Sequence, residues 1–120
     1  MRIPRIVLAT AFTLAVSVNA MAAGAIAVDD DGDISGGDAG YGIVTGEASR
    51  EDAAKAALKQ CRSSGNSSCK VVVRFDVCGA YASSKKYFGV GWGNTDAEAQ
   101  RKALDECGQG SCKILVSDCE

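Results

Sequence analysis

The 120-residue chain contains no histidine, one tryptophan and one proline. Without histidine, a Ser-His-Asp or Cys-His catalytic arrangement cannot form, and the usual general base near neutral pH is missing. The spacing Cys-x-x-Cys, a common signature of redox and zinc sites, is also absent. These absences leave enzymatic activity open but favour a non-enzymatic protein, and we expect no cofactor and no metal site.

The N-terminal segment has the pattern of a secretory signal peptide. Two arginines precede an apolar run at residues 6–18, and the small residues Ala20 and Ala22 follow it. We expect cleavage after Ala22, or alternatively after Ala20, so that residues 1–22 form the leader and residues 23–120 a single mature domain. An uncleaved N-terminal anchor is the other interpretation.

The mature domain is acidic. Loss of the two leader arginines leaves eleven basic residues against fifteen acidic ones, so the formal net charge falls from −2 to −4. An acidic domain without a basic stripe is not expected to bind nucleic acid, nor to stay inserted in a membrane after cleavage of the leader. Export predicts a periplasmic or extracellular protein whose partner is another protein or an envelope component; the oligomeric state stays open.

The mature sequence is internally repetitive, with residues 24–78 echoed by residues 79–119. Repeated blocks in the same order indicate one supersecondary unit used twice. The matching blocks are residues 24–27 and 79–82, 41–46 and 88–93, 49–52 and 95–98, 57–58 and 103–104, 69–73 and 112–116, and 76–78 and 117–119, with Cys61 matching Cys107.

Each copy predicts the element order β-β-α-β. The short apolar runs punctuated by glycine are typical of strands, whereas Ser49 with Asp52 and Thr95 with Glu98 have the capping-box spacing of helix starts. Alanines at helical spacing follow both boxes, so both helices can approach a sheet closely. We therefore predict an α+β fold with one antiparallel or mixed sheet, both helices on one face, and a pseudo-two-fold axis between the copies.

Six cysteines allow fifteen pairings, and the repeat favours one of them. A cysteine ends each expected helix and another opens the strand that follows, so a bond within each copy would join helix to strand. The two remaining cysteines end equivalent strands and could bridge the copies. The favoured pairs are Cys61–Cys69, Cys107–Cys112 and Cys78–Cys119. A thiolate metal or redox site is the alternative, and it would have to persist in an oxidising compartment.

An acidic cluster lies in the loop of residues 29–40, which is longer than the matching loop of the second copy. Asp29, Asp31 and Asp33 alternate as at the start of a calcium loop, but Gly40 stands at the twelfth position, where such a loop needs glutamate. A solvated turn is the simpler interpretation. The same carboxylates could serve a hydrolase acting on envelope glycans, since paired carboxylates catalyse glycoside hydrolysis.

The single tryptophan lies in a run that alternates with glycines at residues 88–93. In a strand, Trp92 would share one face with Val90, and the bare glycine face would admit a close neighbour. Tyr81 lies nearby in sequence and could complete an aromatic binding surface with Trp92; a tryptophan buried under a packed element is the alternative. Arg74 and Asp76, two residues apart, are expected to pair in solvent.

Taken together, these motifs resemble the bacterial domain-of-unknown-function family 4189. The blocks at residues 24–27, 49–54, 69–72 and 78–80, with the closing Asp118-Cys119, carry the resemblance across the mature chain. It implies a small, exported, cysteine-containing domain and brings no catalytic residues with it. The sequence thus favours a disulfide-stabilised binding module of the envelope or the cell exterior, with a carboxylate-dependent hydrolase or a calcium-binding accessory domain as alternatives.

Overall fold

A computed structural model describes residues 22–29, 40–108 and 110–120 of the chain. The expected leader and its cleavage sites, apart from Ala22, lie outside these residues. The elements are β1 Ala23–Asp29, β2 Gly40–Glu47, α1 Arg50–Ser63, β3 Lys70–Phe75, β4 Cys78–Ser83, β5 Phe88–Gly93, α2 Asp96–Cys107 and β6 Lys113–Cys119. Over the described ranges, no helix combines the length and apolarity that crossing a bilayer requires.

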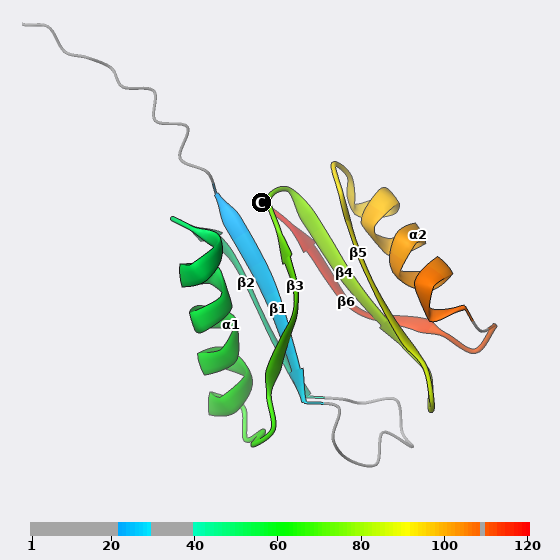
Figure 1. Ribbon diagram of the computed structural model, residues 1–120, viewed down its shortest axis with the longest axis horizontal. Coiled ribbons are helices and arrows are strands. Elements are labelled where there is room, and N and C mark those ends of the chain that lie inside the picture. The colour runs from blue at the N-terminus through cyan, green and yellow to red at the C-terminus, as the bar shows by residue number, and fades with distance from the viewer. Residues whose placement is uncertain (1–21, 30–39, 109) are drawn as a thin grey trace, which may run out of the picture.

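The strands form two antiparallel sheets, with the orders β2-β1-β3 and β5-β4-β6. The sheets lie face to face, and α1 and α2 cover their outer faces on opposite sides of the molecule (Figure 1). The fold is α+β as predicted, but the expected single sheet with both helices on one face is wrong. The physical reason lies in the central strands β1 and β4, which are buried on both faces and so need a helix on one side and a second sheet on the other.

Side-chain size differs between the layers of the core. Beneath α1, the cluster consists of alanines and Cys61, and a matching cluster of alanines and cysteines lies beneath α2. Between the sheets, the cluster contains the bulkier Ile26, Phe75 and Tyr81. Each helix therefore lies close to its sheet, whereas large side chains fill the space between the sheets.

Glycines in β5 allow the close approach of α2. A Cβ atom built on Gly91 would lie 2.1 Å from the Ala99 carbonyl oxygen, and one on Gly89 would lie 2.3 Å from the Ala103 carbonyl oxygen. Both neighbours are backbone atoms of α2, so no rotamer change could relieve the clash. α2 thus packs on the glycine face of β5, and Trp92 lies on the opposite face.

Both helices begin at the residues that the capping spacing predicts. The Ser49 hydroxyl accepts a hydrogen bond from the Asp52 amide, and the Thr95 hydroxyl accepts one from the Glu98 amide. Glu98 also accepts from the Asn94 amide, which lowers the pKa of its carboxyl, with a further contribution from Lys102. Each cap satisfies a helix-end amide that has no partner inside the helix.

Three disulfides join the six cysteines, and no described cysteine is free. The bonds are Cys61–Cys69, Cys107–Cys112 and Cys78–Cys119, the pairs that the repeat favours. The first two join a helix end to the next strand. The third joins the last residue of the first copy, as defined from the sequence, to the second copy, and it lies within one sheet because Cys78 begins β4 and pairs with Cys119 of β6 on the neighbouring strand.

Candidate functional site

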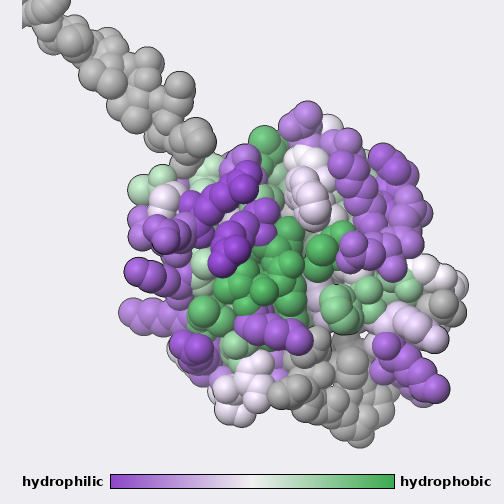
Figure 2. Space-filling view, viewed as in Figure 1, coloured by the Kyte–Doolittle hydropathy of each residue, from purple (hydrophilic) through white to green (hydrophobic). Residues whose placement is uncertain are grey.

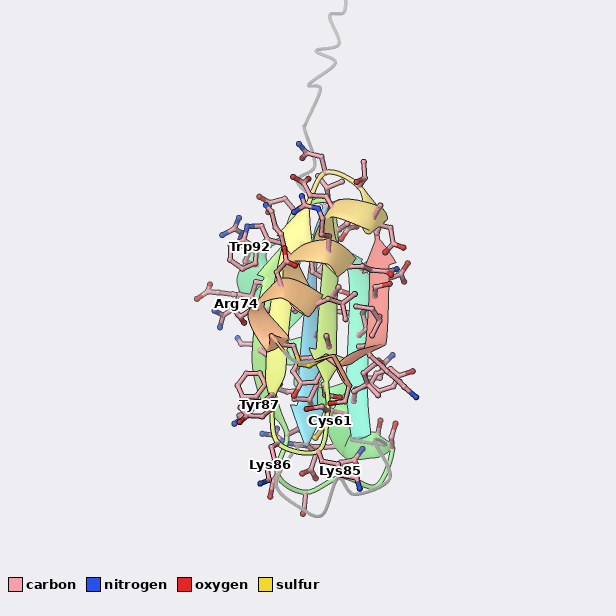
Figure 3. All side chains as sticks on the ribbon, turned by 90° about the vertical axis from the view of Figure 1, so that its right-hand side faces the viewer. Cys61, Arg74, Lys85, Lys86, Tyr87 and Trp92 are labelled. Carbon is pink, nitrogen blue, oxygen red and sulfur yellow. A yellow bond between two sulfur atoms is a disulfide. The ribbon has the colours of Figure 1, made fainter. Side chains whose placement is uncertain are left out.

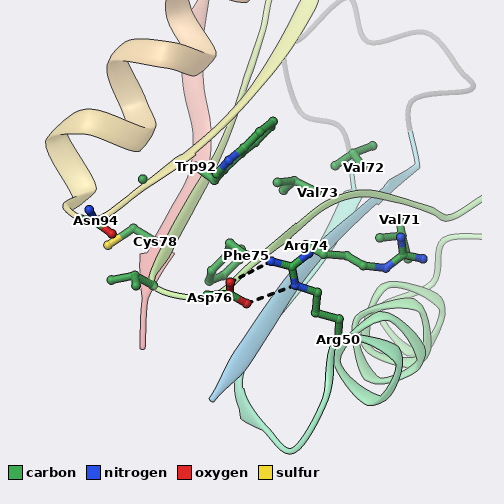
Figure 4. Close-up of a pocket in the computed structure, with 12 residues that line it drawn as sticks. Arg50, Val71, Val72, Val73, Arg74, Phe75, Asp76, Cys78, Trp92 and Asn94 are labelled. Carbon is green, nitrogen blue, oxygen red and sulfur yellow. Dashed lines mark hydrogen bonds and ion pairs between the residues drawn. The ribbon is translucent and has the colours of Figure 1, made fainter. Parts of the chain in front are cut away.

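A groove of about 510 Å³ opens between the edge strands β3 and β5, where the two sheets meet at one side of the molecule (Figure 4). Its walls are β3 with the turn that follows it, the end of β5 at residues 92–94, and Arg50 at the start of α1. We call this surface the β3–β5 groove. The groove is concave and has both apolar and polar walls, as binding sites for small ligands and peptide segments usually do.

Trp92 projects over this groove. Its neighbours Gly91 and Gly93 face α2, so the indole must point to the other side of β5, toward β3. Since β5 is an edge strand, the ring extends past the sheet and stays 55% exposed. Figure 4 shows the indole reaching across the groove toward Val72 and Val73. A large aromatic surface left in solvent at a concave site is unusual for packing alone.

The floor of the groove is apolar because of an irregularity in β3. The register with β1 shifts between Ile26 and Ala27, so that Ile26 pairs with Val73 while Ala27 pairs with Val71. Val72 is the extra residue, and it packs against the cluster between the sheets, to which Val73 belongs. Figure 2 shows the result, an apolar patch in the middle of this face with hydrophilic residues on both sides.

The rim of the groove carries a two-bond ion pair. The Arg50 guanidinium donates to both carboxylate oxygens of Asp76, at 3.1 and 2.7 Å. The hydrogen bond from Arg50 lowers the pKa of Asp76, and the charge of Arg50 adds to the effect. The expected pairing of Asp76 with Arg74 is therefore wrong, because the start of α1 brings Arg50 to the same carboxylate.

We expect the Arg50–Asp76 pair to add a small stability that depends on pH. Because the pKa of Asp76 is lowered in the folded protein, its contribution is present above the ordinary value of 3.8 and disappears as the pH falls below it. Asp76→Asn should lower the Tm slightly at about pH 7 and lower it less at about pH 2, as measured by circular dichroism. An equal loss at both pH values would show that the carboxylate acts through packing rather than charge.

Cations and aromatic rings follow the same edge of the molecule. Figure 3 places Trp92, Arg74, Tyr87 and Lys86 one after another along it. Tyr87 is 49% exposed, and no ion pair within the described ranges involves Arg74, Lys85 or Lys86. Arg74 thus lines the groove as a cation without an ion pair among the described residues, and Tyr87 and the Lys85-Lys86 pair lie beyond it toward one end of the molecule.

Of the residues singled out for binding that the structure describes, only Trp92 lines the groove. Tyr81 is 1% exposed and lies between the sheets, 5.9 Å from the Phe88 ring between centroids. The prediction of a surface role for Tyr81 is therefore wrong, because the central strand β4 is covered on both faces. Tyr87, at the other end of β5 from Trp92, is an exposed aromatic residue that does not line the groove.

The structure describes one residue of the acidic cluster, Asp29. Asp29 ends β1, and its carboxylate accepts hydrogen bonds from the Ser67 and Ser68 amides, each at 3.1 Å. It therefore holds the connection between α1 and β3 in place. Asp31 and Asp33 lie outside the described residues. Within the residues that the structure describes, no group of three or more histidine, cysteine, aspartate or glutamate side chains could hold a metal ion.

Sequence reasoning missed Arg74 and Val72 as parts of one surface. Their alternation on a strand was visible, but the bulge that turns Val72 toward the groove depends on pairing with β1, and β5 is distant in sequence. The absence of an acidic residue near the Lys85-Lys86 pair was a local signal of the cationic turn between β4 and β5.

The model of one protein family, described as a domain of unknown function (DUF4189), matches residues 23–119. The chain belongs to this family, and the match covers all six strands, both helices and every cysteine. No curated protein and no solved structure matches the chain. The family assigns no activity, so the chemistry of the site is the guide to function.

Proposed function

We propose that this protein is an exported binding module of the cell envelope or the extracellular space, and that the β3–β5 groove is its ligand site. The observation that carries the proposal is the exposed indole of Trp92, held over an apolar floor by glycines that bind the strand tightly to α2. An aromatic ring fixed on a rigid strand makes contact at low entropic cost, which is why such rings dominate binding energy at interfaces.

The three disulfides support a location outside the cytoplasm. They cross-link a domain of modest core size, as is common in proteins that work in oxidising compartments, and they agree with the expected signal peptide. We propose the periplasm or the cell exterior as its place of action, in contact with a protein or another envelope component.

The hydrolase and the calcium interpretations gain no support from the described residues. Asp76, the one carboxylate at the rim of the groove, is held by Arg50, and its lowered pKa makes it a poor general acid. Asp29 is engaged by backbone amides of the α1–β3 connection. Binding is therefore the function that this site supports best.

We infer further that the two halves of the domain are tandem repeats related by a pseudo-two-fold axis. The central strand of each sheet is the first strand of its half, and the register shifts at matching places, between Ile26 and Ala27 and between Tyr81 and Ala82. The repeat would place the β2–β6 edge opposite the β3–β5 groove. There Thr45 stands where the second half has Trp92, so the tryptophan belongs to one edge alone.

The proposal is tested by affinity capture from the envelope fraction of the source cells with three immobilised proteins. These are the wild type, Trp92→Ala, and Tyr41→Ala, which alters a 39% exposed ring on β2 at the opposite edge. We expect a component that the wild type and Tyr41→Ala both enrich and that Trp92→Ala enriches at least about tenfold less. Equal enrichment by all three proteins would place the binding site elsewhere.

A further inference from the structure

We propose that the occupant of the β3–β5 groove is an extended protein segment that adds to β3 as a further strand and carries acidic side chains. This inference rests on the proposed function and names the class of ligand. It follows from three features of the described residues: the open edge of β3, the two environments on either side of that edge, and the cation Arg74 on it.

The outer edge of β3 is the most available backbone edge beside the groove. Over residues 71–75, β3 pairs with β1 on one side, and no described strand pairs with the other side. On β5, by contrast, the Val90 amide donates to Glu106 of α2 at 2.8 Å, and on β2 the Ile43 amide donates to Gln60 of α1. No helix side chain within the described ranges accepts from β3 in this way. An open strand edge binds extended peptides through main-chain hydrogen bonds.

An added strand would meet a different environment on each face. Val73 pairs with Ile26 and faces the space between the sheets, whereas Arg74 pairs with Ala25 and lies on the α1 face. Successive side chains of a strand point to opposite faces. One set of side chains would therefore enter the apolar groove against Trp92, and the other would lie beside Arg74. The segment that fits alternates apolar and acidic residues.

The charge beside β3 favours an acidic segment over two other occupants, a second copy of this chain and an anionic glycan. Arg74 on β3 has no ion pair within the described ranges, and neither have Lys85 and Lys86 in the turn between β4 and β5, although the mature domain carries a net charge of −4. A second copy of this acidic chain would meet overall repulsion. An anionic glycan could form ion pairs with the cations, but it would form no strand pairing with the β3 backbone. It would therefore use only one of the two kinds of interaction available there.

The chain has a built-in probe for this test, because Trp92 is its only tryptophan. We would titrate the full mature protein with an acetylated and amidated peptide of alternating glutamate and valine, seven residues long, and follow the tryptophan emission. We expect a saturable change in the emission. The same peptide with N-methyl groups on the amides of one edge should bind at least about tenfold more weakly, because it cannot complete the strand pairing.

Charge reversal isolates the contribution of Arg74. Arg74→Glu should weaken binding of the glutamate peptide at least about tenfold and bind a peptide with lysine in place of glutamate. Lys113→Glu changes the net charge equally but lies on β6, so it should leave both affinities near those of the wild type. Circular dichroism of each variant shows whether it is folded, and the unaltered protein with the two peptides keeps the test valid if a variant is not.

The possible outcomes separate this inference from the proposed function. If an oligogalacturonate changes the emission of Trp92 and the glutamate peptide does not, the groove is a ligand site but its ligand is not a protein segment. If the N-methylated and unmethylated peptides bind equally, strand addition is overturned while the groove stands. Self-association in analytical ultracentrifugation that Trp92→Ala abolishes would overturn the acidic partner in favour of a second copy.

Discussion

Replacing Cys78 and Cys119 together by alanine is expected to lower the free energy of unfolding by about 3–4 kcal/mol. The bond between them closes a loop with a sequence separation of 41, and it joins the first residue of β4 to the last residue of β6. Without this bond, only strand pairing and packing hold β6 to the central strand β4, and the unfolded chain can expand further. Guanidinium denaturation of the oxidised variant would measure the loss.

The matched control removes Cys107 and Cys112, whose sequence separation is only 5. Since the entropy of loop closure grows with loop length, this variant should lose only about 2 kcal/mol. A larger loss from this pair than from Cys78 and Cys119 would contradict the reasoning, and would mean that the link from α2 to β6 carries more of the stability than the link within the sheet.

The substitution Gly91→Ala, which adds a single methyl group, is expected to lower the free energy of unfolding by about 2–3 kcal/mol. The new Cβ atom would lie 2.1 Å from the Ala99 carbonyl oxygen and 2.6 Å from the Ala103 amide nitrogen, so α2 would have to move away from β5. A domain of this size should lose more than about 10 °C of Tm in consequence. Differential scanning calorimetry of Gly91→Ala and of the unaltered protein measures this difference in Tm.

Gly110→Ala is the same substitution at a site where no atom lies within 4 Å of the added Cβ. It should change stability by no more than about 0.5 kcal/mol. If Gly91→Ala proves as mild as Gly110→Ala, then α2 does not lie against β5 as closely as described. The orientation of Trp92, which depends on that contact, would then need a different explanation.

Local signals predicted the elements of this fold well, because hydroxyl caps, alanine-rich helices and glycine-punctuated strands act within a few residues of one another. Ser49 and Thr95 both cap helices, and the three cysteine pairs are those predicted from the sequence blocks. The layering could not be obtained in the same way. Whether β1 and β4 share a sheet depends on contacts between Ile26 and Tyr81, residues far apart in the chain.

The candidate site was predictable only in part, for a similar reason. Trp92 stood out as the single tryptophan, and its separation from the glycine face followed from strand alternation. The groove itself needs β3 and β5 to meet at an edge, and it needs the bulge that turns Val72 inward. Tyr81 was chosen because it is near Trp92 in sequence, but the burial of a central strand decided its position.

The most direct test of the β3–β5 groove as a peptide-binding site is amide hydrogen exchange by NMR, with and without a saturating amount of the alternating glutamate–valine peptide. We predict that the peptide slows exchange of the amides in Lys70–Phe75 that face away from β1 and shifts the indole N–H of Trp92, while the amides of β6 exchange at unchanged rates. Protection confined to β6, β2 or the helices, with β3 unchanged, would contradict it.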